Sequence, residues 1–131
     1  CDMSDFRNWF LKICKKYLNT PYLWGGRTSY GIDCSGYTQM VYRFFGVKLP
    51  RDAYQQEKKG ESINFPDVKM GDLAFFKEKD KITHVGIILN NKKIIHSSGK
   101  VKINYIDKKG IYENTMLKKY THKLESIKRI L

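Results

Sequence analysis

The sequence has no long apolar run, few acidic residues and few cysteines. No run reaches the about 18 apolar residues that a membrane-spanning helix needs, so we expect no membrane span. Asp and Glu number 13 against 25 Lys and Arg, which gives a net charge of +12. Such an excess attracts polyanions, such as nucleic acid or anionic lipid. Because the lysines are scattered in short pairs and no nucleic-acid motif is present, we interpret the charge as a solvated surface and expect no nucleic-acid partner.

The three cysteines fit neither of two common classes of cysteine site. Their number is odd, and positions 1, 14 and 34 match neither a disulfide framework nor a zinc-binding spacing. We therefore expect no metal and no cofactor. Cys14 belongs to an apolar helical pattern and should be a buried thiol. The chain starts at Cys1 rather than Met, which leaves two alternatives: a lipid anchor at Cys1, or a start made by processing or excision.

The pattern of apolar residues changes along the chain. The 131 residues, 41% of them hydrophobic, suit one globular domain over residues 1–131. Helical spacing and turn residues predict helices over 4–18 and 34–45 and a short helix that starts at residues 50–52 and runs to 57, with a glycine-rich loop over 22–32. Runs of β-forming residues predict strands over 73–76, 85–89, 93–96, 101–105 and 124–130. Helices followed by antiparallel strands predict an α+β fold, in which N-terminal helices pack on an antiparallel sheet.

The stretch GIDCSG, residues 31–36, has features of a reactive thiol. A helix that begins near Cys34 directs its free N–H groups and the positive end of its dipole at the sulfur, which predicts a lowered thiol pKa. A buried structural cysteine is the alternative. Asp33 is compatible with a helix N-cap and with a site residue, and one side chain can serve as both.

A cysteine nucleophile needs a base within hydrogen-bonding reach, and that base needs an orienting partner. His84 begins the run HVGIIL, His96 ends KKIIHSS, and Asn90-Asn91 marks the turn between them. The two imidazoles lie on one face of this hairpin if its loop has three or five residues or a bulge, but not with a plain two-residue turn. His122 lies outside the hairpin and is interpreted as a surface or strand-edge residue. Because the chain has no short Cys/His ligand pair, a metal site is the less favoured alternative.

Six short motifs, in this order and spacing, resemble the NlpC/P60 family of cell-wall cysteine peptidases. They are YLWGG (22–26), DCSG (33–36), LPR (49–51), GDL (71–73), HVG (84–86) and IH (95–96). The resemblance covers residues 17–98 best. The later segments GKVKIN and HKLESIKRI are similar to the γ-D-glutamyl-L-diamino acid endopeptidase branch. The resemblance to the NlpC/P60 family implies a papain-like fold, in which a helix carrying the cysteine packs on an antiparallel sheet carrying the histidines.

The resemblance also implies catalytic roles for four residues. Cys34 would be the nucleophile, His84 the general base and later the acid, and His96 the neutral group that orients His84. Tyr22 would help the Cys34 backbone N–H to stabilise the oxyanion.

Four further residues match family positions that line the substrate pocket: Asp33, Ser35, Arg51 and Asp52. The acidic group at Asp33 would meet a free substrate amine. Ala53 departs from the small hydroxyl residue that family members often carry, which puts a pocket contact there in doubt. Trp24 is expected to belong to the scaffold.

The function implied is hydrolysis of the amide between γ-D-Glu and a diamino acid, diaminopimelate or Lys, in peptidoglycan stem peptides. Two alternatives stay open: an acyltransferase of the same fold superfamily and a non-catalytic cell-wall-binding module. An extracytoplasmic location is favoured over cytoplasmic recycling of stem peptides. The branch usually carries SH3-like modules before this domain, and none is present in these 131 residues. The third stem residue, the need for a free L-Ala amine and the oligomeric state are left open.

Overall fold

The structure is a computed structural model that describes residues 3–28, 31–116 and 118–130. Within these residues the helices are α1 (Met3–Lys15), α2 (Cys34–Arg43), α3 (Ala53–Gln56) and the 3₁₀ helix η1 (Phe65–Asp67). The strands are β1 (Arg27–Thr28), β2 (Gly31–Ile32), β3 (Glu61–Ser62), β4 (Leu73–Glu78), β5 (Lys81–Ile88), β6 (Lys93–Ser98), β7 (Lys100–Asp107), β8 (Gly110–Tyr112) and β9 (Tyr120–Arg129). None of the described helices is both long and apolar enough to cross a membrane.

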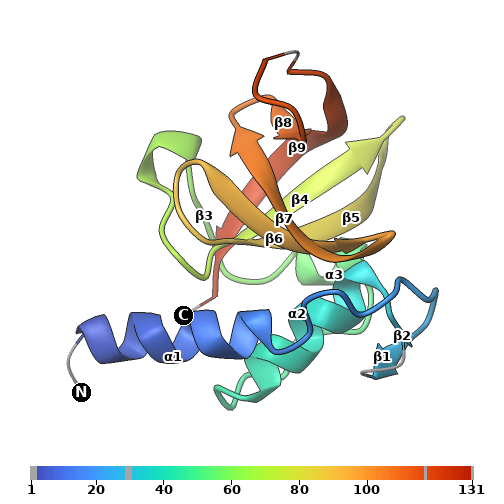
Figure 1. Ribbon diagram of the computed structural model, residues 1–131. Helices are drawn as coiled ribbons and strands as arrows, with labels where there is room; N and C mark the ends of the chain where they lie inside the picture. The colour runs from blue at the N-terminus through green and yellow to red at the C-terminus, as the bar shows by residue number, and fades with distance from the viewer. Residues whose placement is uncertain (1–2, 29–30, 117, 131) are drawn as a thin grey trace.

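The helices α1, α2 and α3 lie together on one side of a seven-stranded sheet (Figure 1). The strand order is β3-β9-β4-β5-β6-β7-β8, every neighbouring pair is antiparallel, and an additional β8–β9 pairing curls the sheet into a barrel-like arrangement. The prediction of an α+β fold with helices packed on an antiparallel sheet is confirmed.

Alternation along the strands divides the apolar core into two clusters. In β5, Val85 and Ile87 face the helices and pack in the cluster that contains Phe10 and Tyr37. Ile88 belongs to the second cluster, inside the barrel, together with buried side chains from β4, β6 and β7. Successive strand residues point to opposite faces, so His84 shares the barrel face with Ile88 and not the helix face with Val85.

The β5–β6 hairpin has the register that the two histidines require. Gly86 pairs with His96 and Ile88 with Ile94, so the five residues 89–93 lie between the last two paired residues, and the last of them, Lys93, is the first residue of β6. Asn90 Oδ1 accepts hydrogen bonds from the backbone N–H groups of Lys92 and Lys93 and stabilises this turn. The condition that the sequence left open is therefore met, and His84 and His96 lie on one face.

Several elements differ from the predictions. Helix α1 ends at Lys15 rather than near residue 18, and β5 begins at residue 81, four residues before the predicted start. The predicted loop over 22–32 contains β1 and β2, and β3 and β8 were not predicted. Strands of two or three residues are too short to show an alternating pattern, so their pairing comes from tertiary contacts rather than from local sequence.

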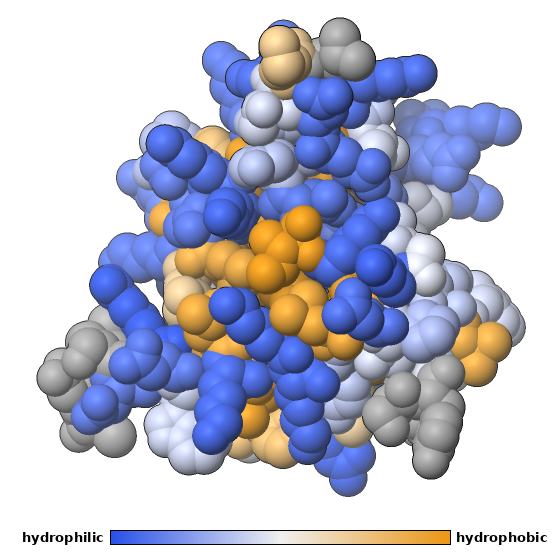
Figure 2. All heavy atoms as spheres, in the orientation of Figure 1, coloured by the Kyte–Doolittle hydropathy of each residue, from blue (hydrophilic) through white to orange (hydrophobic). Residues whose placement is uncertain are grey.

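Hydrophilic side chains cover most of the face in Figure 2, around an apolar patch near its centre. This distribution agrees with lysines spread over a solvated surface.

Candidate active site

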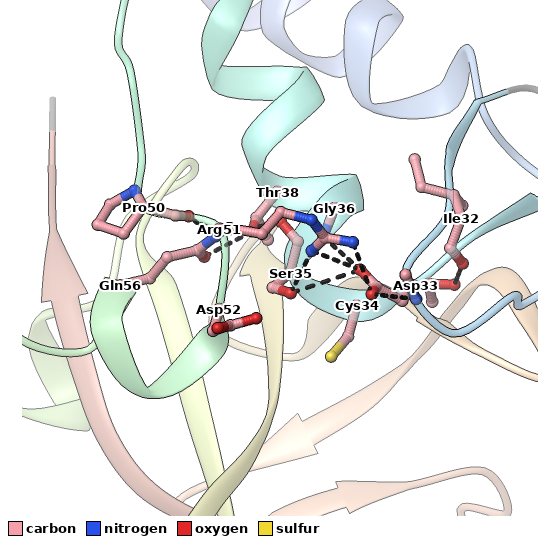
Figure 3. Close-up of polar contacts among 12 residues, drawn as sticks. Ile32, Asp33, Cys34, Ser35, Gly36, Thr38, Pro50, Arg51, Asp52 and Gln56 are labelled. Atoms are coloured by element: carbon pink, nitrogen blue, oxygen red, sulfur yellow. Dashed lines mark hydrogen bonds and ion pairs between the residues drawn. The ribbon is translucent and has the colours of Figure 1, made fainter.

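Cys34 is the first residue of α2, and the turn before it is held by Asp33. The Asp33 carboxylate caps the helix by accepting a hydrogen bond of 2.6 Å from the Gly36 backbone N–H. Figure 3 shows the Cys34 sulfur pointing from the helix start toward the sheet, away from the Asp33 carboxylate. Cys34 Sγ lies 3.9 Å from the Thr83 carbonyl oxygen, and the Val85 backbone N–H also interacts with it. The thiol therefore lies against the backbone on both sides of His84.

The environment of Cys34 keeps its thiol protonated at neutral pH. Burial raises the pKa of the Cys34 thiol, and the nearby Asp33 charge raises it further. Hydrogen bonds from Val85 and from the first turn of α2 act in the opposite direction but are outweighed. The prediction of a lowered pKa was wrong because it considered the helix terminus and not the desolvation that packing against β5 imposes.

His84 and His96 form a hydrogen-bonded pair. His84 Nε2 lies 2.8 Å from His96 Nδ1, and His96 Nε2 lies 2.7 Å from Asn104 Oδ1 on β7. Gly86 faces His96 across the β5–β6 pair, and a Cβ atom added there would lie 2.9 Å from the His96 Cβ. Because Gly86 has no side chain, the His96 side chain can lie close to the β5 backbone.

Both rings of the pair are buried and neutral. Burial lowers the pKa of His84 well below its usual value, and the charges of His96, His122 and Lys102 add to this effect. Burial likewise lowers the pKa of His96 to about 4, although the Asn104 hydrogen bond partly opposes it. The site therefore combines a neutral thiol with a neutral imidazole pair at neutral pH.

The third histidine also belongs to this cluster. His122 on β9 stacks on His84 with ring centroids 4.3 Å apart and an interplanar angle of 24°, and Phe76 lies against both rings. The interpretation of His122 as a surface or strand-edge residue was wrong, because β9 pairs with both β4 and β8 and carries it over His84. Its alternating strand pattern was visible in sequence, but the pairing partner was not.

A bidentate ion pair lies beside the start of α2. Arg51 donates to both carboxylate oxygens of Asp33 at 3.1 and 2.9 Å, and also to Ser35 Oγ at 2.9 Å (Figure 3). Asp33 also accepts from the backbone N–H groups of Gly25 and Gly36. Burial alone would raise the pKa of Asp33, but these bonds outweigh it and hold that pKa below its usual value. They occupy the lone-pair positions of both Asp33 oxygens.

Cys34 opens into a cavity of about 400 Å³. Its lining includes all four predicted pocket residues together with Tyr22, and the remaining lining residues are Trp24, Gly25, Ala53, Tyr54, Ile82 and Thr83. The structure therefore brings Tyr22, Asp33, Cys34, Ser35, Arg51 and Asp52 together. Asp52 is exposed at this cavity, whereas Asp33 is buried.

Trp24 forms part of the wall of this cavity. Its side chain is 85% exposed, so Trp24 does not belong to the apolar core. Tyr54, on α3, is a second exposed aromatic ring in the same lining. Exposed aromatic rings beside a cavity offer apolar contact area to a ligand.

His84 opens into a second hollow of about 500 Å³, which shares Thr83 with the first. Strands β4, β5 and β9 and the turn between β4 and β5 supply its lining, which includes Lys77, Lys79, His122 and Lys123. The candidate nucleophile and the candidate base thus open into neighbouring hollows on the two sides of Thr83. Among the described residues, no group of three or more His, Cys, Asp or Glu side chains is placed to hold a metal ion.

Comparison with known proteins decides the family. The model of the NlpC/P60 family matches residues 19–122, which is most of the chain and includes the candidate nucleophile and both hairpin histidines. The chain belongs to the NlpC/P60 family. Its helices packed on an antiparallel sheet are the α+β, papain-like arrangement that the resemblance implied.

Curated relatives of this NlpC/P60 domain are named as peptidases. It is 42% identical over 84 residues to the γ-D-glutamyl-L-lysine dipeptidyl-peptidase of Bacillus subtilis (strain 168), covering 62% of this chain and 28% of that protein. It is 41% identical over 78 residues to the murein DD-endopeptidase MepS/murein LD-carboxypeptidase of Escherichia coli (strain K12), covering 59% of this chain and 42% of that protein. The chain thus spans less than half of each relative.

A solved structure agrees over nearly the whole chain. The crystal structure of an NlpC/P60 family protein from Bacillus cereus ATCC 10987 superposes with a TM-score of 0.81 at 27% identity. The superposition covers 95% of this chain and 40% of that protein. Nearly the whole chain thus has the fold of an NlpC/P60 family protein.

Proposed function

We propose that this domain hydrolyses the amide between γ-D-Glu and the diamino acid of peptidoglycan stem peptides, through an acyl-enzyme on Cys34. The observation that carries the proposal is the position of the Cys34 sulfur, which lies against the backbone on both sides of His84 and opens into a cavity. The name of the Bacillus subtilis relative, γ-D-glutamyl-L-lysine dipeptidyl-peptidase, supports this bond class. The name of the Escherichia coli relative supports murein as the source of the substrate but specifies other bonds. A substrate of this kind makes an extracytoplasmic location part of the proposal.

The neutral thiol and imidazole define the first step. Because His84 Nε2 is engaged by His96, His84 Nδ1 is the nitrogen left for the Cys34 proton. His84 removes that proton as the sulfur attacks the scissile carbonyl carbon, so the imidazolium exists only during turnover. The developing oxyanion is stabilised by the Cys34 backbone N–H and the Tyr22 hydroxyl.

Collapse of the tetrahedral intermediate completes acyl transfer. The C–N bond breaks, and His84 returns its proton to the leaving amine, which departs as the diamino-acid half of the stem. Water then attacks the thioester, with His84 again accepting a proton, and releases the γ-D-Glu carboxylate together with the free Cys34 thiol. His96 keeps the His84 ring in orientation throughout both half-reactions.

The acyl half of the substrate fits the cavity at Cys34. A free L-Ala amine needs a carboxylate with unused oxygens, and the Asp33 oxygens are occupied by Arg51, Gly25 and Gly36. Asp52 is the exposed carboxylate of this cavity, so we assign the amine contact to Asp52 and a supporting role to Asp33. Ser35 and Arg51 hold Asp33 in place rather than offering free groups to the ligand.

The diamino-acid half of the substrate, which contains the leaving amine, belongs in the second hollow, at His84. His84 has to lie next to the leaving nitrogen in order to protonate it, and His84 lines that hollow. The substrate would then cross Thr83, with its acyl half beside Cys34 and its diamino acid beside β9.

The test is mass spectrometry of digests of defined muropeptides with tri- and tetrapeptide stems, with and without a free N-terminal L-Ala. Wild type should produce L-Ala-γ-D-Glu and the diamino-acid fragment, and Cys34→Ala should produce neither. An amine acceptor is included, because a transfer product in place of the free acid would instead identify an acyltransferase. Equal murein binding by wild type and Cys34→Ala, with no cleavage by either, would identify a binding module and overturn the proposal.

A further inference from the structure

Asn104 is the outer end of a hydrogen-bonded chain that leads to the proposed base. Its Oδ1 lies 2.7 Å from His96 Nε2, and His96 Nδ1 lies 2.8 Å from His84 Nε2. Asn104 on β7 faces Ile94 on β6, one alternation away from His96, so both side chains lie on the barrel face. His96 has no exposed surface, and its two ring nitrogens are satisfied by these two neighbours.

The chemistry of the three side chains determines which atom donates and which accepts in each of these hydrogen bonds. A neutral imidazole has one N–H donor and one acceptor nitrogen. If the Asn104 carbonyl oxygen accepts from His96 Nε2–H, then His96 Nδ1 accepts from His84 Nε2–H, and His84 Nδ1 is left unprotonated. With the Asn104 amide reversed, its NH₂ group would donate, and each proton would move to the opposite nitrogen. His84 Nδ1 would then carry a proton and could not act as a base.

We propose that Asn104 is a positioning residue that, through His96, holds His84 in the tautomer whose Nδ1 accepts the Cys34 proton. This role rests on the proposed function, because only a reacting Cys34 needs that tautomer. The amide oxygen accepts the bond without adding a charge, and the neighbouring histidines are neutral. A carboxylate at the same position would accept the same bond but would stabilise the imidazolium.

Charged and titratable groups surround the pair from several elements. Lys102 on β7 and His122 on β9 act on the pair, and the Cys34 thiol lies against the backbone carbonyl of Thr83, next to His84. Glu113, which follows β8, is paired with Lys102 at 2.9 Å, and Glu78 at the end of β4 lies toward His122. These groups are the same in wild type and in any variant of Asn104, so a change in pH profile reports the change at residue 104.

Two substitutions separate an acceptor role from packing alone. Asn104→Leu removes the acceptor at similar volume, and we expect kcat to fall at least about tenfold with KM little changed, as loss of an outer hydrogen-bond partner does at other sites. Asn104→Asp keeps the acceptor, so it should retain most of kcat while the acid limb of kcat/KM moves to higher pH. Asn91→Leu, in the exposed β5–β6 turn, is the matched control and should match wild type. Thermal unfolding checks that each variant is folded.

Long-range ¹H–¹⁵N spectra of the three histidines read the tautomers directly, without any substrate. Wild type should show His96 Nε2 and His84 Nε2 protonated and His84 Nδ1 unprotonated, and Asn104→Leu should lose this pattern. The opposite tautomers in wild type would overturn the proposal, and so would wild-type kcat and pH profile in Asn104→Leu. A folded Asn104→Asp as inactive as Asn104→Leu would also overturn it, since that result identifies Asn104 as a donor. Absence of any cleavage by wild type would instead count against the proposed function, while the tautomer result stands by itself.

Discussion

The two sides of the Cys34 site differ in their electrostatics. On the α2 side, Asp33 and Arg51 form a bidentate ion pair whose carboxylate also accepts two backbone N–H bonds. On the β5 side, the histidines are buried, hydrogen-bonded in a chain and neutral. We infer that charge organises the cavity for the ligand, whereas the reacting groups stay neutral until a proton moves between them. A neutral resting pair avoids the cost of burying an ion pair beside the sheet.

The largest effects should come from substitution of the neutral reacting groups, Cys34 and His84. Cys34→Ala and His84→Ala should each lower kcat/KM on the order of 10⁴-fold, because each removes a group that takes part in bond making or proton transfer. His96→Ala should lower it less, since it orients the base but does not react. The measurement is steady-state cleavage of a muropeptide.

Cys14→Ala is the matched control: this second thiol is buried in the helix-side core, and burial raises its pKa to about 12. Total loss of activity in Cys14→Ala would show that the wrong thiol was assigned.

The two carboxylates of the charged side should separate into different roles. Asp52→Asn should raise KM for a stem with a free N-terminal amine and should leave an N-acetylated stem unaffected. Asp33→Asn removes the charge that pairs with Arg51, and we expect it to lower thermal stability and activity on both stems. Kinetics on the matched pair of stems checks this difference. Selective loss on the free-amine stem in Asp33→Asn, with no such loss in Asp52→Asn, would reverse the assignment.

Acid should destabilise the histidine side first. The pKa of His96 is about 4 in the folded protein against 6.5 as the ordinary value, so the unfolded chain binds more protons between these limits. The stability contributed by the neutral ring is complete above about pH 6.5 and is lost as the pH falls toward about 4. Thermal unfolding as a function of pH measures this loss. His96→Gln should show a shallower fall over the same window, and an unchanged slope would contradict the assignment.

The smallest effect should come from the aromatic wall of the cavity. Trp24→Ala should raise KM by a few-fold with little change in kcat, because it removes contact area and no reacting group. Trp9→Ala is the matched control, since Trp9 is also exposed, at 59%, but lies on α1 outside that lining. Equal changes in the two variants would show that Trp24 makes no particular contact with the ligand.

Local patterns predicted more of the fold than of the electrostatics. The helical spacing after Asp33 and the β-forming runs on either side of Asn90 were sufficient to predict α2 and the β5–β6 hairpin. Whether His84 and His96 share a face was left open by the sequence, because it depends on the length of the loop, and the register of Gly86 with His96 decides that they do. Helix α2 and the hairpin depend on neighbours within a few residues, so propensity and alternation reveal them.

Other parts of the site depend on pairings across long stretches of sequence. His122 reaches His84 because β9 returns between β4 and β8, and Asn104 reaches His96 through the register of β7. No local pattern identifies those partners. The Cys34 pKa also differs from the prediction for this reason, since the desolvation that raises it comes from β5, about 50 residues along the chain.

The sequence by itself determined where the thiol would begin a helix, which two histidines would belong to one hairpin, and which family the motifs belong to. Only the tertiary structure decided that the Asp33 oxygens are already occupied, that a third histidine stacks on the base, and that the thiol and imidazoles rest uncharged. The physical reason is that helix starts and hairpins follow from short-range geometry, whereas burial, charge pairing and tautomer depend on groups that folding brings together.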